Sequence, residues 1–254
     1  MLRPLLLIAL LCGASAVPAQ MATNYGSISV KAKSIKAAGA AKSGMVRKRF
    51  YLFEGGLKEN KTLVDRIKAA EITSRDCYYA GLNASPCFIS WLQAENCESP
   101  FCRKVEKADV QGIKEFETSY NKGLTLYNRR PDIALDWIVN NMPLQLVSGF
   151  YDKQKSLIDQ ILTGLKPIQS TMTTSTGVEA NFIDIPVGDK PAKYLISNVI
   201  PTEVGNKSYV WACEVDITSK KPNTQINLTA TGPKTCAVTV RDLKVCNTGA
   251  CDKK

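Results

Sequence analysis

Histidine is missing from all 254 residues of the chain. Without an imidazole, neither a Ser-His-Asp triad nor a Cys-His pair can form, and histidine-ligated zinc and copper sites are excluded as well. The commonest catalytic centres of exported hydrolases are therefore closed to this protein.

Long apolar runs are also missing once the first residues are passed. The N-terminus has one charged residue, Arg3, then an apolar run over residues 5–11 and small residues at 13–16. This pattern is typical of a cleaved secretory signal, whereas a membrane span needs about 20 apolar residues. We expect cleavage after Ala16, or alternatively after Gln20. The mature chain is expected to have no transmembrane segment and to be secreted or periplasmic.

Acidic residues are outnumbered, with 23 Asp and Glu against 33 Lys and Arg, and the formal charge of +10 becomes +9 when Arg3 is removed. The basic residues are spread along the chain, and no RNP, zinc-finger or helix-turn-helix signature accompanies them. Nucleic acid is therefore not the expected partner, while an acidic polysaccharide remains an alternative. The nearest approach to a basic cluster is Lys31, Lys33, Lys36, Lys42, Arg47, Lys48 and Arg49.

Cysteine is plentiful by comparison. Nine are present, and the loss of Cys12 with the signal leaves eight, an even number that favours disulfides in an oxidising compartment. A zinc site of four thiolates is disfavoured, because paired zinc ligands usually lie two to four residues apart. We predict no metal site and eight crosslinked cysteines: Cys77, Cys87, Cys97, Cys102, Cys213, Cys236, Cys246 and Cys251.

The spacing of these cysteines allows three pairings within each group of four. Ser85-Pro86 predicts a helix start that places Cys87 in a first turn, and a bend at 81–83 would fold Cys77 back toward it. The pairs favoured by this local reasoning are Cys77–Cys87, Cys97–Cys102, Cys213–Cys236 and Cys246–Cys251.

Hydrophobic periodicity changes twice along the mature chain and predicts an α+β protein. Residues 21–56 contain two candidate strands, at 27–30 and 50–53, and residues 57–169 show the spacing of helices. Residues 178–254 contain five candidate strands, which predict a small antiparallel β-sandwich stapled by disulfides. Five strands make a thin sandwich, so we favour a fold in which the N-terminal strands complete it and the helices form an insertion. A helical domain independent of the sandwich is the alternative.

Several stretches resemble uncharacterised exported bacterial proteins: "RKRFYLFEGGL" before a helix, "WLQAENCESPFC", and the tail "KYLISNVIP…YVWACEVDI". The tail is similar to the carboxypeptidase-regulatory-like, transthyretin-type β-sandwich. The resemblance covers about the last third of the chain. It implies a non-catalytic module in an envelope or secreted protein.

Two patterns offer histidine-free catalysis, and both have plainer interpretations. Ser119 and Lys122 form an S-x-x-K motif, but the Lys-Ser-Gly element at 42–44 precedes it, the reverse of the order in penicillin-binding enzymes. Asp132 and Asp136 lie one helical turn apart and offer a pair of carboxylates. The plainer interpretation is that the helix dipole favours an acidic residue in a first turn. We assign no catalytic residue and expect no cofactor.

Aromatic residues around the first cysteine group are the candidates for binding. Tyr78, Tyr79 and Phe101 are expected to be presented by a crosslinked loop, and Trp91 is expected to pack beneath the crosslinks. The sequence predicts a non-enzymatic binding or structural protein of the cell envelope or secreted fraction. Its partner is unknown, with an envelope protein or a polysaccharide as candidates. The alternatives are an exported hydrolase with a carboxylate or Ser-Lys centre, and a basic binder of anionic polymer.

Overall fold

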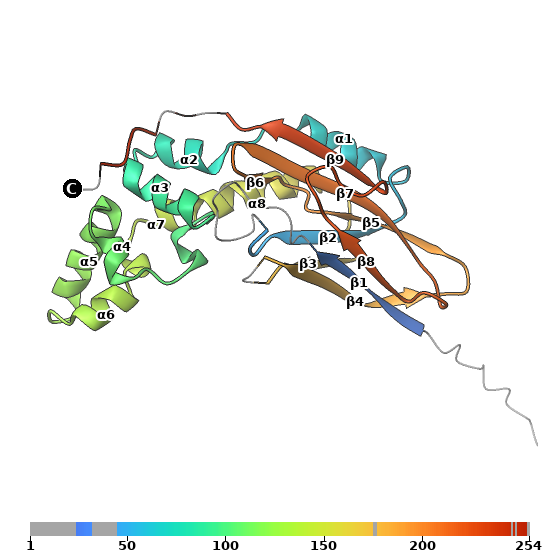
Figure 1. The fold of residues 1–254 in the computed structure, drawn as a ribbon, viewed down its shortest axis with the longest axis horizontal. Helices are drawn as coiled ribbons and strands as arrows, with labels where there is room; N and C mark the ends of the chain where they lie inside the picture. The colour runs from blue at the N-terminus through green and yellow to red at the C-terminus, as the bar shows by residue number, and fades with distance from the viewer. Residues whose placement is uncertain (1–23, 32–44, 175–176, 245, 247, 253–254) are drawn as a thin grey trace, which may run out of the picture.

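The computed structural model describes residues 24–31, 45–174, 177–244, 246 and 248–252, so the expected signal peptide lies outside the described residues. Figure 1 shows an elongated molecule with a helical lobe at one end and two β-sheets at the other. The α+β class predicted from the sequence is confirmed.

Strands and helices follow the expected order along the chain. The strands are β1 (Asn24–Lys31), β2 (Arg49–Glu54), β3 (Gln169–Met172), β4 (Glu179–Val187), β5 (Ala192–Ser197), β6 (Thr202–Val204), β7 (Lys207–Ile217), β8 (Asn223–Asn227) and β9 (Cys236–Asp242). The helices are α1 (Lys61–Ala69), α2 (Arg75–Gly81), α3 (Pro86–Ala94), α4 (Lys107–Val110), α5 (Lys114–Leu126), α6 (Pro131–Asp136), α7 (Leu144–Val147) and α8 (Gly149–Ile161), with short 3₁₀ turns at Pro100–Cys102 and Val139–Asn141.

The strands form two sheets. The smaller has the order β4-β1-β8, and the larger has the order β3-β2-β5-β7, with β6 and β9 also paired to β7. Both predicted N-terminal strands are confirmed, and each pairs on both sides with strands from the C-terminal part of the chain. The β1–β8 pair is parallel, a departure from the antiparallel sandwich that was expected.

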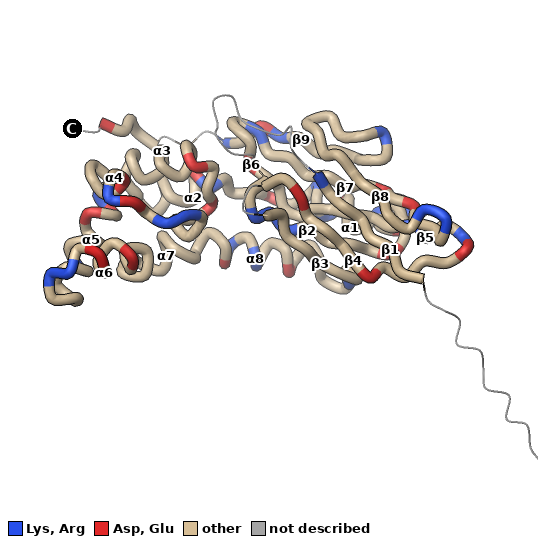
Figure 2. Tube along the Cα trace, turned by 60° about the horizontal axis from the view of Figure 1, so that its bottom comes forward, with Lys and Arg blue, Asp and Glu red and all other residues tan. Residues whose placement is uncertain are grey.

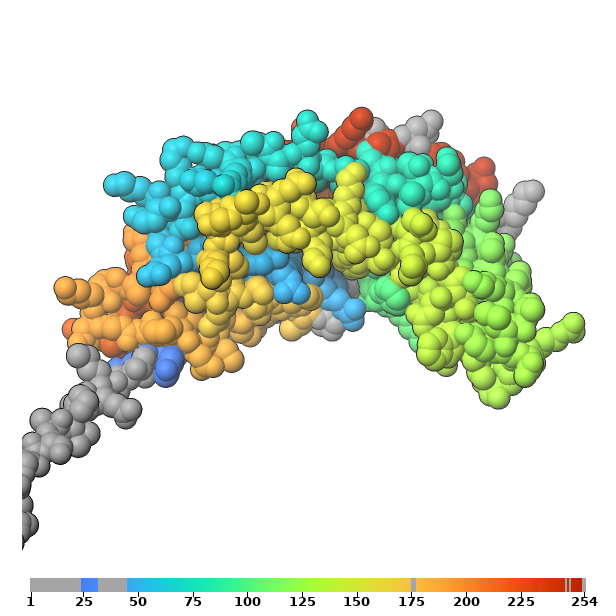
Figure 3. Space-filling model, turned by 180° about the vertical axis from the view of Figure 1, so that it is seen from behind, coloured from blue at the N-terminus to red at the C-terminus, as the bar shows by residue number. Residues whose placement is uncertain are grey.

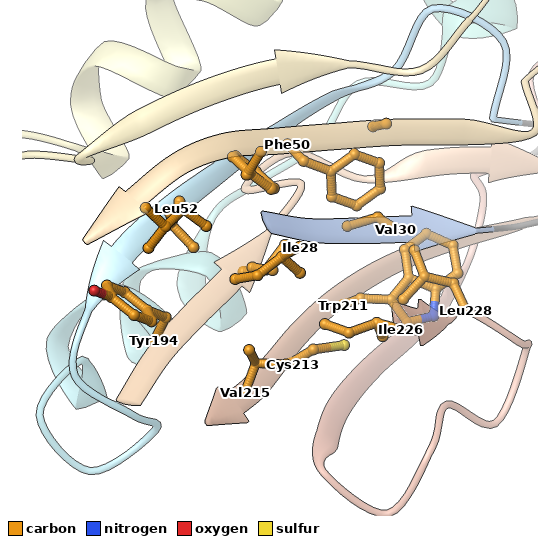
Figure 4. Close-up of a cluster of buried hydrophobic side chains, with 14 of the residues drawn as sticks. Ile28, Val30, Phe50, Leu52, Tyr194, Trp211, Cys213, Val215, Ile226 and Leu228 are labelled. Atoms are coloured by element: carbon orange, nitrogen blue, oxygen red, sulfur yellow. The ribbon is translucent and has the colours of Figure 1, made fainter. Parts of the chain in front are cut away.

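The main core lies between the two sheets. Alternating side chains of β1, Ile28 and Val30, are fully buried against residues of the larger sheet, including Phe50 and Trp211. Figure 4 shows these side chains meeting in one layer between the sheets. Since β1 occupies the centre of the smaller sheet, the sandwich requires a strand that precedes the helices in sequence.

A second layer of helix covers the outer face of the larger sheet. Tyr51, Phe53 and Leu195 point away from the sandwich core and pack against Leu63 of α1 and Ile161 of α8. The remaining helices form the lobe, whose core is separate and is entered by Phe150 from the first turn of α8. Helix α8 therefore belongs to both parts and connects them, as Figure 1 shows.

The disulfides correct part of the predicted connectivity. Cys97–Cys102 and Cys213–Cys236 are confirmed. The pairs Cys77–Cys87 and Cys246–Cys251 are wrong, because the bonds are Cys77–Cys246 and Cys87–Cys251. Cys77 and Cys87 lie in the first turns of successive helices, so α2 carries the chain away from Cys77, and the bonds to Cys246 and Cys251 bring the end of the chain to both helix starts.

Four disulfides indicate a protein of an oxidising, non-cytoplasmic compartment. Within the described ranges, no helix is both long and apolar enough to cross a bilayer.

Two local differences from the predicted elements have a common cause. At the end of the expected helical segment, before the expected β-rich tail begins at residue 178, the chain forms an edge strand, β3, which pairs with β2. Within the segment 57–169 that was expected to be helical, α6 stops at Asp136 and the chain continues in a 3₁₀ turn at Val139–Asn141. In both places, packing against neighbouring elements overrides a weak local pattern.

Candidate binding cleft

The tyrosines predicted to bind a ligand are largely taken up by the helical lobe. Tyr79 is fully buried in α2, so the expectation that a loop presents it to a ligand is wrong, and its hydroxyl lies 3.0 Å from the Glu98 carbonyl oxygen. Burial raises the pKa of Tyr79 far above the usual value. Tyr78 is half-buried, stacks edge-on against Tyr79 and donates to the Gln145 carbonyl. Neither ring is presented to solvent as a ligand platform.

Phe101 and Trp91 behave as the sequence predicts. Phe101 is 51% exposed, beside the Cys97–Cys102 crosslink. Trp91 is buried in the lobe, where its indole N–H donates to Asp109 at 2.9 Å and the Arg103 guanidinium lies 4.8 Å above its ring.

The two catalytic patterns do not form centres. Ser119 is buried whereas Lys122, three residues further along α5, is exposed, so the S-x-x-K pair is split between the inside and outside of the lobe. Ser119 lies on the buried face of α5, with Phe116 and Gly123. Asp132 pairs with Arg130, and Asp136 pairs with Lys104.

A cleft of about 440 Å³, lined by several charged side chains, lies between the sandwich and α8. One wall is the chain entering β2, with Arg47, Arg49 and Tyr51, and the opposite wall is α8. Figure 3 shows α8 (yellow) lying across this face with the blue chain of β2 beneath it. The cleft is also lined by Glu98 of the crosslinked loop, Met172, and the segment that joins β5 to β6.

Opposite charges face each other across this cleft. Arg47 and Arg49 stand on the strand wall, while Asp152, Lys155 and Asp159 follow one another along α8. Figure 2 shows basic positions at the start of β2 and alternating acidic and basic positions along α8. Among the described residues, no ion pair within 4 Å joins these two walls. Arg49 donates to the Ser170 hydroxyl at 3.2 Å, and Asp152 accepts from the Ser148 hydroxyl at 3.2 Å. Each of these groups has more donors or acceptors than these bonds use, so both walls keep hydrogen-bonding capacity for a ligand.

Two tyrosine hydroxyls lie among these charges. Burial raises the pKa of Tyr51, and the nearby Arg49 opposes the rise while Asp159 adds to it. Burial likewise raises the pKa of Tyr151, against the influence of Arg47. Both hydroxyls therefore stay protonated at neutral pH, where each can donate and accept a hydrogen bond.

The inner end of the cleft is held by an ion pair. The Lys48 ammonium contacts the Glu98 carboxylate, and both side chains are largely buried. Gln154 of α8 donates to the same carboxylate at 3.3 Å. A satisfied pair of this kind attaches the crosslinked loop to β2 and α8, so the cleft wall is a fixed part of the fold.

The turn between β5 and β6, residues 198–201, forms the ridge of the cleft. The buried Asn198 amide donates to the carbonyls of Ile200 and Tyr209, and its oxygen accepts from the Trp211 amide at 2.9 Å. Val199 has φ +58°, a left-handed conformation that is costly for a β-branched residue. These bonds hold the strained turn and project Ile200 toward α8.

The cleft could not be predicted from the sequence, and the reason is physical. Its charged residues come from strand, loop and helix, and none of them stands in a spaced motif. The one available signal was the basic run Arg47-Lys48-Arg49, which belongs to the predicted cluster. Lys31 is paired with Glu179 elsewhere, and Lys33, Lys36 and Lys42 lie outside the described residues.

The fold and the cleft define a disulfide-linked α+β protein with an open, charge-lined cleft between a β-sandwich and a connecting helix. Comparison with protein-family models, curated proteins and solved structures found no match to this chain.

Proposed function

We propose that this protein is an exported, non-enzymatic glycan-binding protein whose ligand lies in the cleft between β2 and α8. The signal pattern at residues 1–16 supports export to the envelope or to the medium. The resemblance of the C-terminal strands to the carboxypeptidase-regulatory-like sandwich supports a non-catalytic module.

The observation that carries this proposal is that arginines on one wall of the cleft face aspartates on the other, with no ion pair joining them among the described residues. Sugar hydroxyls both donate and accept, so a polyhydroxylated ligand matches walls that offer arginine donors on one side and aspartate acceptors on the other. Tyr51 and Tyr151 add rings whose edges carry hydroxyls. A volume of about 440 Å³ falls within the range usual for small-ligand sites, which is about 300–1,000 Å³.

A glycan array probed with the purified mature protein tests the proposal. Arg49→Gln and Asp159→Asn should each weaken binding of the retained glycan by about tenfold, since each removes a charge-assisted hydrogen bond of about 1.5 kcal/mol. Arg130→Gln and Asp132→Asn are matched controls, because they make the same charge changes on an exposed pair of α6. Equal effects from both sets of variants would contradict a site in the cleft.

The alternative of a basic binder of anionic polymer gives a different result. Binding through diffuse positive charge would appear as heparin retention that falls steeply with salt and responds equally to Arg49→Gln and Arg130→Gln. Prolonged incubation of retained glycans with the protein tests the hydrolase alternative. Release of shorter products, absent with heat-denatured protein, would replace the binding function with an enzymatic one.

A further inference from the structure

A second hollow, of about 220 Å³, lies on the other side of the Ile200–Pro201 ridge. Its apolar lining includes Phe150 and Leu157 of α8 and Ile72 of the segment between α1 and α2. One carboxylate from the sandwich, Glu203 of β6, also lines the hollow. Because a cavity of about 150 Å³ can hold benzene, this one has room for a slightly larger molecule.

The Glu203 carboxylate has few hydrogen-bond partners for a group that is largely shielded from solvent. One of its oxygens accepts the backbone N–H of Arg75 at 2.7 Å, and among the described residues this is its only hydrogen bond. An ionised carboxylate can accept several hydrogen bonds, so much of this capacity is unused.

The cations nearest to Glu203 are engaged elsewhere. The Arg75 guanidinium bonds to Asp76 at 2.8 Å and to the Cys97 carbonyl at 3.1 Å. Lys48 of the β2 entry is paired with Glu98. Burial raises the pKa of Glu203, Glu98 raises it further, and Arg75 and Lys48 lower it in part.

We propose that this hollow binds a primary ammonium group on a short apolar stem, with Glu203 as its counter-ion. Phe150, Leu157 and Ile200 would surround the stem, and the ammonium would reach the carboxylate at the sandwich side. The site is separate from the cleft and does not rest on glycan binding. The same chemistry is carried by a free diamine and by a lysine side chain.

The charge of Glu203 gives the site a direction of pH dependence. Binding needs the ionised carboxylate, so affinity should fall as the pH decreases through a pKa that lies above the usual glutamate value. Two other charged groups line the hollow: Glu71 from the α1–α2 segment and Lys153 from α8, both exposed. Neither is as shielded from solvent as Glu203, so their effect should be smaller.

The test is an NMR titration of the full mature chain with cadaverine and, in a second arm, with Nα-acetyl-lysine methylamide. Amides beside Glu203 and along residues 150–157 should shift with saturation, and 1-pentanol and valerate should bind at least tenfold more weakly. The stronger of the two amine arms identifies the source of the ammonium group. If 1-pentanol bound as tightly as cadaverine, the proposal would be overturned.

Glu203→Gln is the decisive variant, because glutamine keeps an oxygen that can accept the Arg75 N–H. It should weaken cadaverine binding at least tenfold and remove its pH dependence, with the melting temperature nearly unchanged. Glu71→Gln is the matched control and should change affinity by less than threefold. Unchanged binding in Glu203→Gln, or an equal loss in Glu71→Gln, would overturn the proposal. If Glu203→Gln does not fold, the parent protein tests the proposal by itself. Cadaverine binding that does not change between pH 4 and 8 would then overturn it.

Discussion

Arg103 joins several polar groups in the helical lobe. Its guanidinium contacts Asp109 through two nitrogens and Glu95 at 2.9 Å, and it also covers the Trp91 ring. Burial alone would raise the pKa of Asp109, but hydrogen bonds from Arg103, the Glu106 amide and Trp91 outweigh it. They hold the pKa below the usual value of 3.8.

We therefore predict that Arg103→Ala lowers the free energy of unfolding by about 1–3 kcal/mol at pH 7, since it leaves a shielded carboxylate without its main partner. A carboxyl with a lowered folded pKa stabilises the protein above about pH 3.8, and this contribution is lost as the pH falls through the folded value. The difference between parent and variant should therefore shrink at pH 3. Urea unfolding at both pH values measures it.

Arg130→Ala is the control for this network. Its pair with Asp132 is exposed at the start of α6, so its removal should cost far less than the removal of Arg103. A loss for Arg103→Ala no larger than that of Arg130→Ala would show that the Trp91–Asp109 network does not contribute to stability.

At the scale of elements, α5 and α6 approach closely at a glycine. A Cβ on Gly123 would lie 3.1 Å from both the Cα and the Cβ of Ala134. The obstacle includes backbone, so the neighbouring helix would have to move as a unit.

Gly123→Val should therefore destabilise the protein by about 1–3 kcal/mol, the usual cost of overpacking. Gly81→Val is the matched control, because a Cβ at Gly81 at the end of α2 would meet nothing within 4 Å. Its effect should stay within about 0.5 kcal/mol. Thermal melts of the two variants separate a packing effect from the general loss of glycine.

At the scale of the whole molecule, two disulfides fasten the C-terminal segment to the lobe. They span 169 and 164 residues, and either alone closes a loop worth about 5 kcal/mol in the entropic description. Once one is formed, the other closes a ring of only about 15 residues, worth about 3 kcal/mol.

Removing one bond, by Cys77→Ala with Cys246→Ala, should therefore cost about 3 kcal/mol, and removing both should cost about 8 kcal/mol. The excess of about 2 kcal/mol over additivity is the signature of two crosslinks that close the same long loop. Denaturant unfolding of the parent protein, of the two variants that lack one disulfide each, and of the variant that lacks both completes this thermodynamic cycle. Strict additivity would mean that the two bonds act independently.

The sandwich itself depends on distant parts of the chain. In a fragment of residues 178–254, β4 and β8 lose the central strand β1 that joins them, and β5 loses β2. Cys246 and Cys251 also lose their partners. We predict that this fragment does not fold, with the intact protein as reference. Dispersed amide signals together with a cooperative melt would contradict this.

Much of the local structure could be predicted from the sequence because local chemistry determines it. The Ser85 side chain accepts the Phe88 N–H, as a serine before proline predicts for a helix start. The alternation in 27–30 made Ile28 and Val30 core residues in a strand. The burial of Tyr79 was not predictable, because its ring follows a helical face whose partners come from other helices.

The sequence alone determined the fold class and the absence of imidazole chemistry, and reasoning from short separations found two of the four crosslinks, Cys97–Cys102 and Cys213–Cys236. These depend on composition, periodicity and short loops. Only the tertiary structure decided that the C-terminal cysteines bond to α2 and α3, and that the Arg49 and Asp159 walls face each other. Such pairings depend on where distant strands and helices end in space, and no local pattern carries that information.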